Sequence, residues 1–152
     1  MSEPRVGGVE AGGTKWVCAV GTGPPDLSVS TFPTTTPTET IGRVVSFFRD
    51  AGGVEAVGIG CFGPLDLARG RITTTPKAGW AGTDVVAPIA AALGVPVAFE
   101  TDVGAAAVGE WRWGAAHGRS TFVYVTIGTG IGGAAVADGV ILHGVSHAEM
   151  GH

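Results

Sequence analysis

The chain has 152 residues, of which 45% are apolar and 14% charged, so it can bury a core of about one domain. A formal net charge of −4 and the lack of a basic stripe argue against a nucleic-acid partner. No apolar run approaches the ~20 residues of a membrane span, and the first residues lack the blocks of a secretory signal. We therefore expect a globular, cytoplasmic protein with no membrane partner.

Cysteine and glycine are distributed in an informative way. Cys18 and Cys61 each lie inside an apolar run, which predicts buried free thiols in a reducing compartment. Glycine accounts for 27 residues and has no fixed period, but it gathers in three clusters between β-branched and aromatic stretches. We expect ordered structure in which glycine loops bring backbone atoms close to a ligand.

The beginning of the chain is predicted to be β-structure. Strands are expected at 6–11 and 16–20, joined by a tight hairpin in which Gly12 and Gly13 take positive φ angles. A third strand is expected at 27–32.

A helix follows these strands. Thr36 and Glu39 have the spacing of a capping box around Pro37, and Gly52 marks the end of the helix. Four apolar residues fall at helical spacing within it: Ile41, Val44, Val45 and Phe48. They predict an amphipathic helix.

The middle of the chain alternates strands and helices. A buried strand is expected at 56–61 and a hairpin at 67–74. Asp84 is expected to cap a second helix that ends at Gly94, and a short strand follows at 97–99.

The last third begins with a helix at 102–113 whose alanines and glycines would let another element approach closely. Strands at 122–127 and 133–137 flank a glycine loop, and an Asp-Gly turn leads into a last strand at 140–142. This order of elements predicts a mixed α/β domain built in layers.

The first glycine cluster combines an acid, two glycines, a hydroxyl and an ammonium group: Glu10, Gly12, Gly13, Thr14 and Lys15. Such a loop can bring backbone amides close to a phosphate, while Thr14 and Lys15 add donors. The alternative is a plain β-turn with a solvated lysine, and the cluster alone leaves both open.

The second cluster, residues 128–133, has the GxGxxG spacing of dinucleotide-binding folds. That fingerprint needs a helix after the loop, whereas a strand is expected here, and the sequence has no Walker pattern. The cluster predicts a second phosphate-binding hairpin, with a bulged structural turn as the alternative. Its candidate ligands are Thr129, Gly130, Gly132 and Gly133.

A carboxylate stands where a strand is expected to pass into a helix. Asp102 at this junction could face a cleft and accept a proton from a substrate hydroxyl. Alternatively, Asp102 or Thr101 simply caps the helix. Further groups could line a site for a polyol, with the tryptophan as an aromatic wall: Gly63, Pro64, Asp66, Trp80 and Glu149.

Three of the four histidines lie near the C-terminal end together with Glu149: His143, His147 and His152. Zinc sites normally take four well-placed ligands, and the spacing here fits no closed site. The residues alone therefore leave both metal binding and ordinary surface histidines open.

Four motifs occur in order: EAGGTK at 10–15, ETDVGAAAVGEWRWGAA at 100–116, TIGTGIGG at 126–133 and HAEMGH at 147–152. Together they resemble the ROK family of sugar kinases, within the actin-like ATPase superfamily. The acid at Glu10 is similar to the fructokinase branch, because many other members carry aspartate there. The resemblance implies an α/β fold of the actin-like, ribonuclease H-like type, with a mixed sheet and flanking helices.

The resemblance also implies a role for each matching residue. Asp102 would be the catalytic base, both glycine clusters would bind the phosphates of ATP, and Glu10 would contact Mg²⁺ or its water. His152 would begin a structural Zn²⁺ site whose other ligands follow it. The residues beside the sugar would be Gly63, Pro64, Thr101, Asp102, Glu149 and His152.

The implied protein is an ATP-dependent hexose kinase, with fructose favoured and fructose 6-phosphate as product. A glucokinase or an N-acetylmannosamine-type kinase is the alternative. Residues 1–115 would form one lobe and residues 116–152 the start of a second, so this chain alone would be inactive and the full-length protein a homodimer. A sugar-responsive transcriptional regulator of the same family is disfavoured, because the chain begins almost directly at its first strand and has no basic patch.

Overall fold

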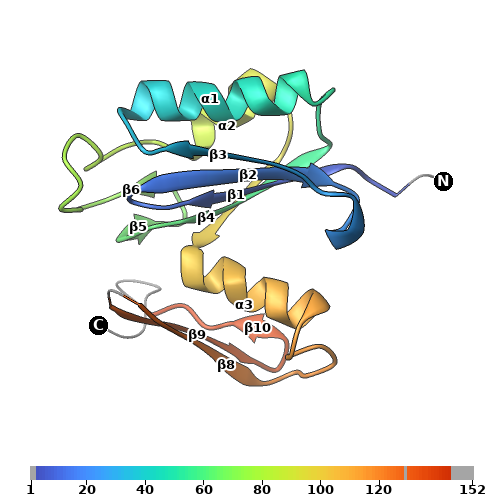
Figure 1. Ribbon diagram of the computed structural model, residues 1–152. Helices are drawn as coiled ribbons and strands as arrows, with labels where there is room; N and C mark the ends of the chain where they lie inside the picture. The colour runs from blue at the N-terminus through green and yellow to red at the C-terminus, as the bar shows by residue number, and fades with distance from the viewer. Residues whose placement is uncertain (1–2, 129, 145–152) are drawn as a thin grey trace.

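The computed structural model describes residues 3–128 and 130–144. Its largest sheet has five strands in the order β3-β2-β1-β4-β7 (Figure 1). These are β1 (Val6–Ala11), β2 (Lys15–Gly21), β3 (Ser28–Pro33), β4 (Ala56–Cys61) and β7 (Val97–Thr101). β1, β2 and β3 pair antiparallel, whereas β4 and β7 run parallel to β1, so the sheet is mixed.

Helices cover both faces of this sheet. α1 (Pro37–Asp50) and α2 (Val86–Leu93) lie on one face, and α3 (Asp102–Trp113) lies on the other (Figure 1). The main core forms between the sheet, α1 and α2, and its largest fully buried side chains include Trp16, Trp80, Phe48 and Ile89. None of the helices in the described ranges is both long and apolar enough to cross a membrane.

A second, smaller sheet packs on the far side of α3. It contains β8 (Phe122–Ile127), β9 (Ile131–Ala137) and β10 (Val140–Ile141), paired antiparallel in the order β10-β9-β8. Its own core is small and consists of three buried residues, with Phe122 and Tyr124 packed against them: Val103, Ala107 and Ala134. α3 is therefore sandwiched between the two sheets (Figure 1).

Three short elements complete the described chain: η1 (Pro24–Asp26), β5 (Leu65–Asp66) and β6 (Arg71–Ile72). β5 and β6 pair as a two-stranded hairpin, whose first strand begins two residues before the predicted hairpin at 67–74.

The observed elements agree closely with the expected ones. The strands at 6–11 and 56–61 and the helix at 102–113 have the predicted bounds. Thr36 caps α1 by accepting a hydrogen bond from the Glu39 amide (3.3 Å), whereas the Glu39 carboxylate binds Thr35 and Arg43. The cap is thus present on the threonine side, and the glutamate serves a surface network.

The two cysteines are buried free thiols, as predicted. Burial raises the pKa of the Cys18 thiol to about 12, which keeps it protonated at neutral pH. Burial also raises the pKa of Cys61, and the negative charge of Asp102 raises it further. Both thiols therefore act as core side chains.

Candidate active site

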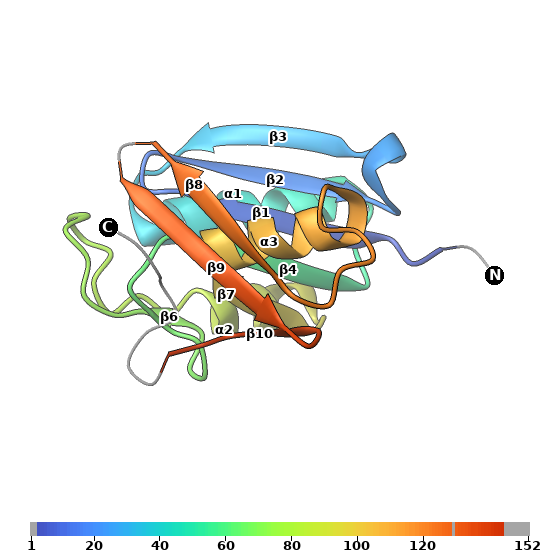
Figure 2. The same cartoon turned by 90° about the horizontal axis from the view of Figure 1, so that it is seen from below.

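The register of the parallel strands brings three loops to one edge of the sheet. Ala11 pairs with Cys61, and Cys61 pairs with Thr101, so β1, β4 and β7 end side by side. The chain leaves this row at Gly12 and at Asp102, and ligands of open α/β sheets bind outside such carboxyl ends. Figures 1 and 2 place the β8–β9 turn at the same end of the molecule.

The first glycine loop is a tight connection between β1 and β2. The Gly12 amide donates to the Lys15 carbonyl (3.0 Å), and an added Cβ at Gly12 would lie 2.6 Å from that oxygen. Gly12 and Gly13 do not have positive φ, so the predicted left-handed turn is wrong. Glycine is needed at 12 because the backbone closes on itself, whereas a Cβ at Gly13 would have no heavy atom within 4 Å.

Thr34, which no sequence motif marks, fixes this loop from the position directly after β3. Its hydroxyl donates to the Gly12 carbonyl (2.7 Å), and its amide donates to the Thr14 carbonyl (2.9 Å). Thr34 is buried, while the side chains of Thr14 and Lys15 are exposed. The backbone of the loop is thus held by the buried Thr34. The hydroxyl group of Thr14 and the ammonium group of Lys15 face solvent at the edge where the parallel strands end.

Asp102 is the first residue of α3, and it is exposed. Its Oδ1 accepts a hydrogen bond from the Val103 amide (2.8 Å). Thr101 is almost fully buried and caps the helix by accepting from the Gly104 amide (3.0 Å). Thr101 therefore fills the capping role, which leaves the carboxylate of Asp102 at the positive end of the helix dipole.

Glycines let three elements converge around the start of α3. An added Cβ at Gly60 would lie 2.5 Å from the Cβ of Ala105, so β4 and α3 touch closely. An added Cβ at Gly132 would lie 2.8 Å from Cγ1 of Val103, so β9 packs on the residue next to Asp102. The expected close approach to this helix is confirmed, and the second glycine loop belongs to the hairpin that makes it.

The second glycine loop joins β8 to β9, and a strand follows it as predicted. The Gly128 amide donates to the Gly130 carbonyl (2.9 Å), which closes the turn. Gly130 is exposed and Gly133 is buried. Thr129 lies outside the described residues.

The loop after β4 is tied to the same edge. The Phe62 amide donates to the Ala11 carbonyl (2.9 Å), and the amide and hydroxyl of Thr73 donate to the Pro64 carbonyl (2.9 and 3.1 Å). Gly63 and Pro64, both half-buried, therefore stand beside the end of β1. Glu149 and His152, the other predicted sugar contacts, lie outside the described residues.

Trp80 does not form the aromatic wall predicted for a polyol. Its side chain is fully buried, its ring packs against Trp16 and Phe62, and its Nε1 donates to the Thr35 carbonyl (2.9 Å). A large aromatic side chain stabilises the protein more by filling the core than by standing in solvent. Asp66 is likewise engaged, since its carboxylate accepts from the amide and guanidinium of Arg69.

Carboxylates lie on the α3 side of the sheet, near Asp102. Glu10 and Glu100 each pair with Gly60, one from β1 and one from β7, so the three form a row across adjacent strands. Such oxygen ligands suit Mg²⁺, but no group of three or more metal-ligating side chains occurs within residues 3–128 and 130–144. The Zn²⁺ ligand predicted at His152 lies outside these ranges, so the described residues contain no zinc site that fits the prediction.

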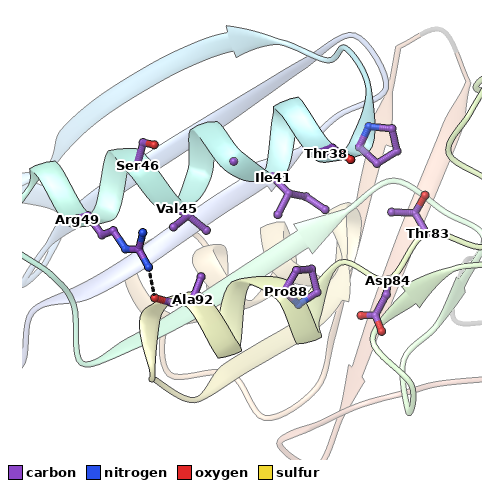
Figure 3. A pocket seen from close by; sticks show the side chains of 11 residues that line it. Thr38, Ile41, Val45, Ser46, Arg49, Thr83, Asp84, Pro88 and Ala92 are labelled. Carbon is purple, nitrogen blue, oxygen red and sulfur yellow. Dashed lines mark hydrogen bonds between the residues drawn. The ribbon is translucent and has the colours of Figure 1, made fainter.

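A groove of about 530 Å³ lies between α1 and α2 (Figure 3). Arg49 closes one end by donating to the Ala92 carbonyl (2.7 Å), and Ile41 and Val45 line its floor. None of the predicted site residues lines this groove, which belongs to the face of the sheet opposite α3.

Known proteins resemble the chain along nearly its whole length. It is 47% identical to the fructokinase of Zymomonas mobilis over 157 residues, and 44% identical to that of Streptococcus mutans over 153 residues. Each alignment covers 96% of this chain but 52% of the relative. The chain thus spans about half the length of these relatives.

Solved structures agree with this relationship. The ROK family glucokinase of Streptomyces griseus, solved with glucose and AMPPNP, is 30% identical with a TM-score of 0.82, covering 95% of this chain and 48% of the glucokinase. The fold is therefore the actin-like ATPase fold of the sugar kinases, as the sequence motifs imply. The sequence profile that describes the ROK family matches residues 6–152 of this chain. The chain belongs to the ROK family.

Proposed function

We propose that this chain provides the first phosphate loop and the catalytic carboxylate of an ATP-dependent hexose kinase that converts fructose to fructose 6-phosphate. The observation that carries the proposal is the position of Asp102, at the start of α3 and at the edge where β1, β4 and β7 end. The identity to fructokinases of other bacteria supports fructose as the substrate.

Asp102 would orient a hexose hydroxyl and accept its proton while the hydroxyl oxygen bonds to the γ-phosphorus of ATP and the bond to the β–γ bridging oxygen breaks, which releases ADP. Phosphoryl transfer depends mainly on positioning the reacting groups and on stabilising the charge that develops on them. The capped start of α3 would hold the carboxylate of Asp102 in a fixed position. Gly63 and Pro64, beside the end of β1, would form part of the sugar site together with Glu149 and His152. The contribution of Thr101 would be indirect, through the helix cap.

The two glycine hairpins would hold the phosphates. Backbone atoms at Gly12 and Gly13, with Thr14 and Lys15, would contact them from β1 and β2. The β8–β9 turn would contact them from the other side of α3 through Thr129, Gly130, Gly132 and Gly133.

Metal ions enter this proposal at two points. Mg²⁺ would offset phosphate charge, and Glu10 would hold it or its water from the end of β1. A structural Zn²⁺ would take His152 as one ligand. Both assignments rest on the family resemblance.

The division into lobes is also part of the proposal. Residues 1–115, which contain the whole main core, would form one lobe and residues 116–152 the start of the second. The complete kinase would be a cytoplasmic homodimer.

A glucokinase is the second candidate, because the S. griseus glucokinase has the same fold as this chain. A coupled assay of a family-length kinase carrying this sequence, run with fructose, glucose, mannose and N-acetylmannosamine, separates the candidates. We expect the highest kcat/KM with fructose. A preference for glucose would favour the second candidate over the first. The absence of turnover with all four sugars would contradict the kinase proposal itself.

A further inference from the structure

The side chain of Glu100 links the two sheets at the position where the chain enters α3. One carboxylate oxygen, Oε1, accepts from the Thr101 amide (2.8 Å), and the other, Oε2, pairs with Nε2 of His143 (2.7 Å). His143 follows β10 and is 43 residues away along the chain. The second sheet is thereby joined to the end of β7, the strand that ends directly before Asp102.

The surroundings hold Glu100 in place. An added Cβ at Gly104 would lie 2.5 Å from Cγ of Glu100, so the first turn of α3 packs directly on the glutamate side chain. That side chain is only 18% exposed, while His143 is 43% exposed. A largely shielded carboxylate needs partners for its oxygens, and here one partner is local and the other comes from the second sheet.

We infer that Glu100 is a positioning residue, and that its contact with His143 latches the segment after β10 onto the end of β7. The inference rests on the proposed function, in which the chain continues past His143 toward the sugar contacts Glu149 and His152. Figure 2 shows β10 running toward the end of the molecule at which the β8–β9 turn lies. The latch fixes the position of His143 and of the described residues beside it, 142–144, relative to the strand end that precedes Asp102.

The contact between Glu100 and His143 should affect the positions of groups near the site more than the free energy of unfolding. A single, partly exposed side-chain contact contributes little to the free energy of unfolding, so loss of the Glu100–His143 hydrogen bond should leave the fold intact. Small displacements of groups that orient a substrate, in contrast, cost much of the rate. The effect should therefore appear in the kinetic constants of the sugar and not in the melting temperature.

The test uses a family-length kinase carrying this sequence. His143→Ala should raise the KM for fructose about 3- to 10-fold and leave the KM for ATP and the melting temperature unchanged. His143→Gln, which keeps an N–H donor, should restore the KM to within about twofold of the original. Arg43→Gln breaks the exposed Arg43–Glu39 pair of the same length, 2.7 Å, and should change neither constant.

A double-mutant cycle assigns the effect to the pair. Glu100→Ala should raise the KM for fructose and also lower kcat, because it removes the acceptor of the Thr101 amide as well. In that background His143→Ala should add no further change in KM. A wild-type KM in His143→Ala, equal changes for both substrates, or additive effects in the double variant would overturn the inference.

Hydrogen exchange of the backbone around residues 140–144 separates this inference from the proposed function. Glu100→Gln and His143→Ala should each accelerate exchange there, whether or not the protein phosphorylates a hexose. Faster exchange without any kinase activity in the unaltered protein would overturn the kinase proposal and keep the latch. Unchanged exchange in both variants would overturn the latch.

Discussion

The two sheets differ in how completely their faces are covered. The five-stranded sheet buries a continuous core under α1 and α2, whereas the core between the three-stranded sheet and α3 has three buried residues, two of them on α3. On the other face of the three-stranded sheet, Val123, Val125 and Ile127 are 64%, 56% and 78% exposed. The first unit therefore has a core of its own, while the second presents an apolar strand face that the described chain leaves bare.

This contrast predicts that the 152-residue chain by itself has no kinase activity, which is the largest effect we expect. The relatives are about twice as long, and a nucleotide held between two lobes reacts only when both can close. ATP-dependent phosphorylation of fructose should stay at background, and sedimentation should show self-association through the exposed face. Robust turnover by a monomeric chain would show that the second sheet needs no further covering for activity, which would contradict this prediction.

Asp102 stands between the two units, so its replacement tests whether the chemistry belongs to that junction. In a family-length kinase, Asp102→Asn should lower kcat by ~10² or more, as expected for loss of a general base. The fold should survive, since Thr101 still caps α3. Asp50→Asn, at the exposed end of α1, is the matched control and should keep full turnover. Near-normal turnover of Asp102→Asn would show that the base lies elsewhere.

A substitution in the main core should lower the free energy of unfolding much more than one on the exposed face of the second sheet. Phe48 is fully buried against β1, where a Cβ at Gly7 would lie 2.5 Å from its ring, so Phe48→Ala should lower the free energy of unfolding by ~3–5 kcal/mol. Val123→Thr, on the exposed face of β8, should change it by less than ~0.5 kcal/mol. Denaturant unfolding measures both. Similar losses for the two variants would mean that the outer face of β8 is already covered.

Smaller losses of stability than that of Phe48→Ala are expected in the first glycine loop, at two adjacent positions. Gly12→Ala should destabilise the protein by ~1–3 kcal/mol, because the new Cβ would meet the Lys15 carbonyl oxygen. Gly13→Ala should cost less than ~0.5 kcal/mol, since no heavy atom lies within 4 Å of the new Cβ. It should nevertheless raise the KM for ATP if a phosphate approaches this backbone. An unchanged KM for ATP in Gly13→Ala would reduce the loop to a structural turn.

Local patterns in the sequence were sufficient to predict most of the elements. The stretch before the Gly12-Gly13 pair and the buried run at 56–61 predicted the bounds of β1 and β4. The threonine cap and the helical spacing of the apolar residues located α1. The strand after the second glycine loop argued correctly against a dinucleotide fold. These features depend on neighbours within a few residues, which is why the order of residues alone determines them.

Other features depend on contacts between distant parts of the chain. Trp80 is a residue type that often lines sugar sites, but here its side chain fills the core beside Trp16. No pattern in the sequence indicates that the two tryptophans are in contact. Thr34 holds the first glycine loop from 22 residues away, and Glu100 meets His143 from 43 residues away. The sequence by itself determined the elements and the candidate carboxylate. Only the tertiary structure decided which side chains surround it, because pairing register and helix packing set those distances.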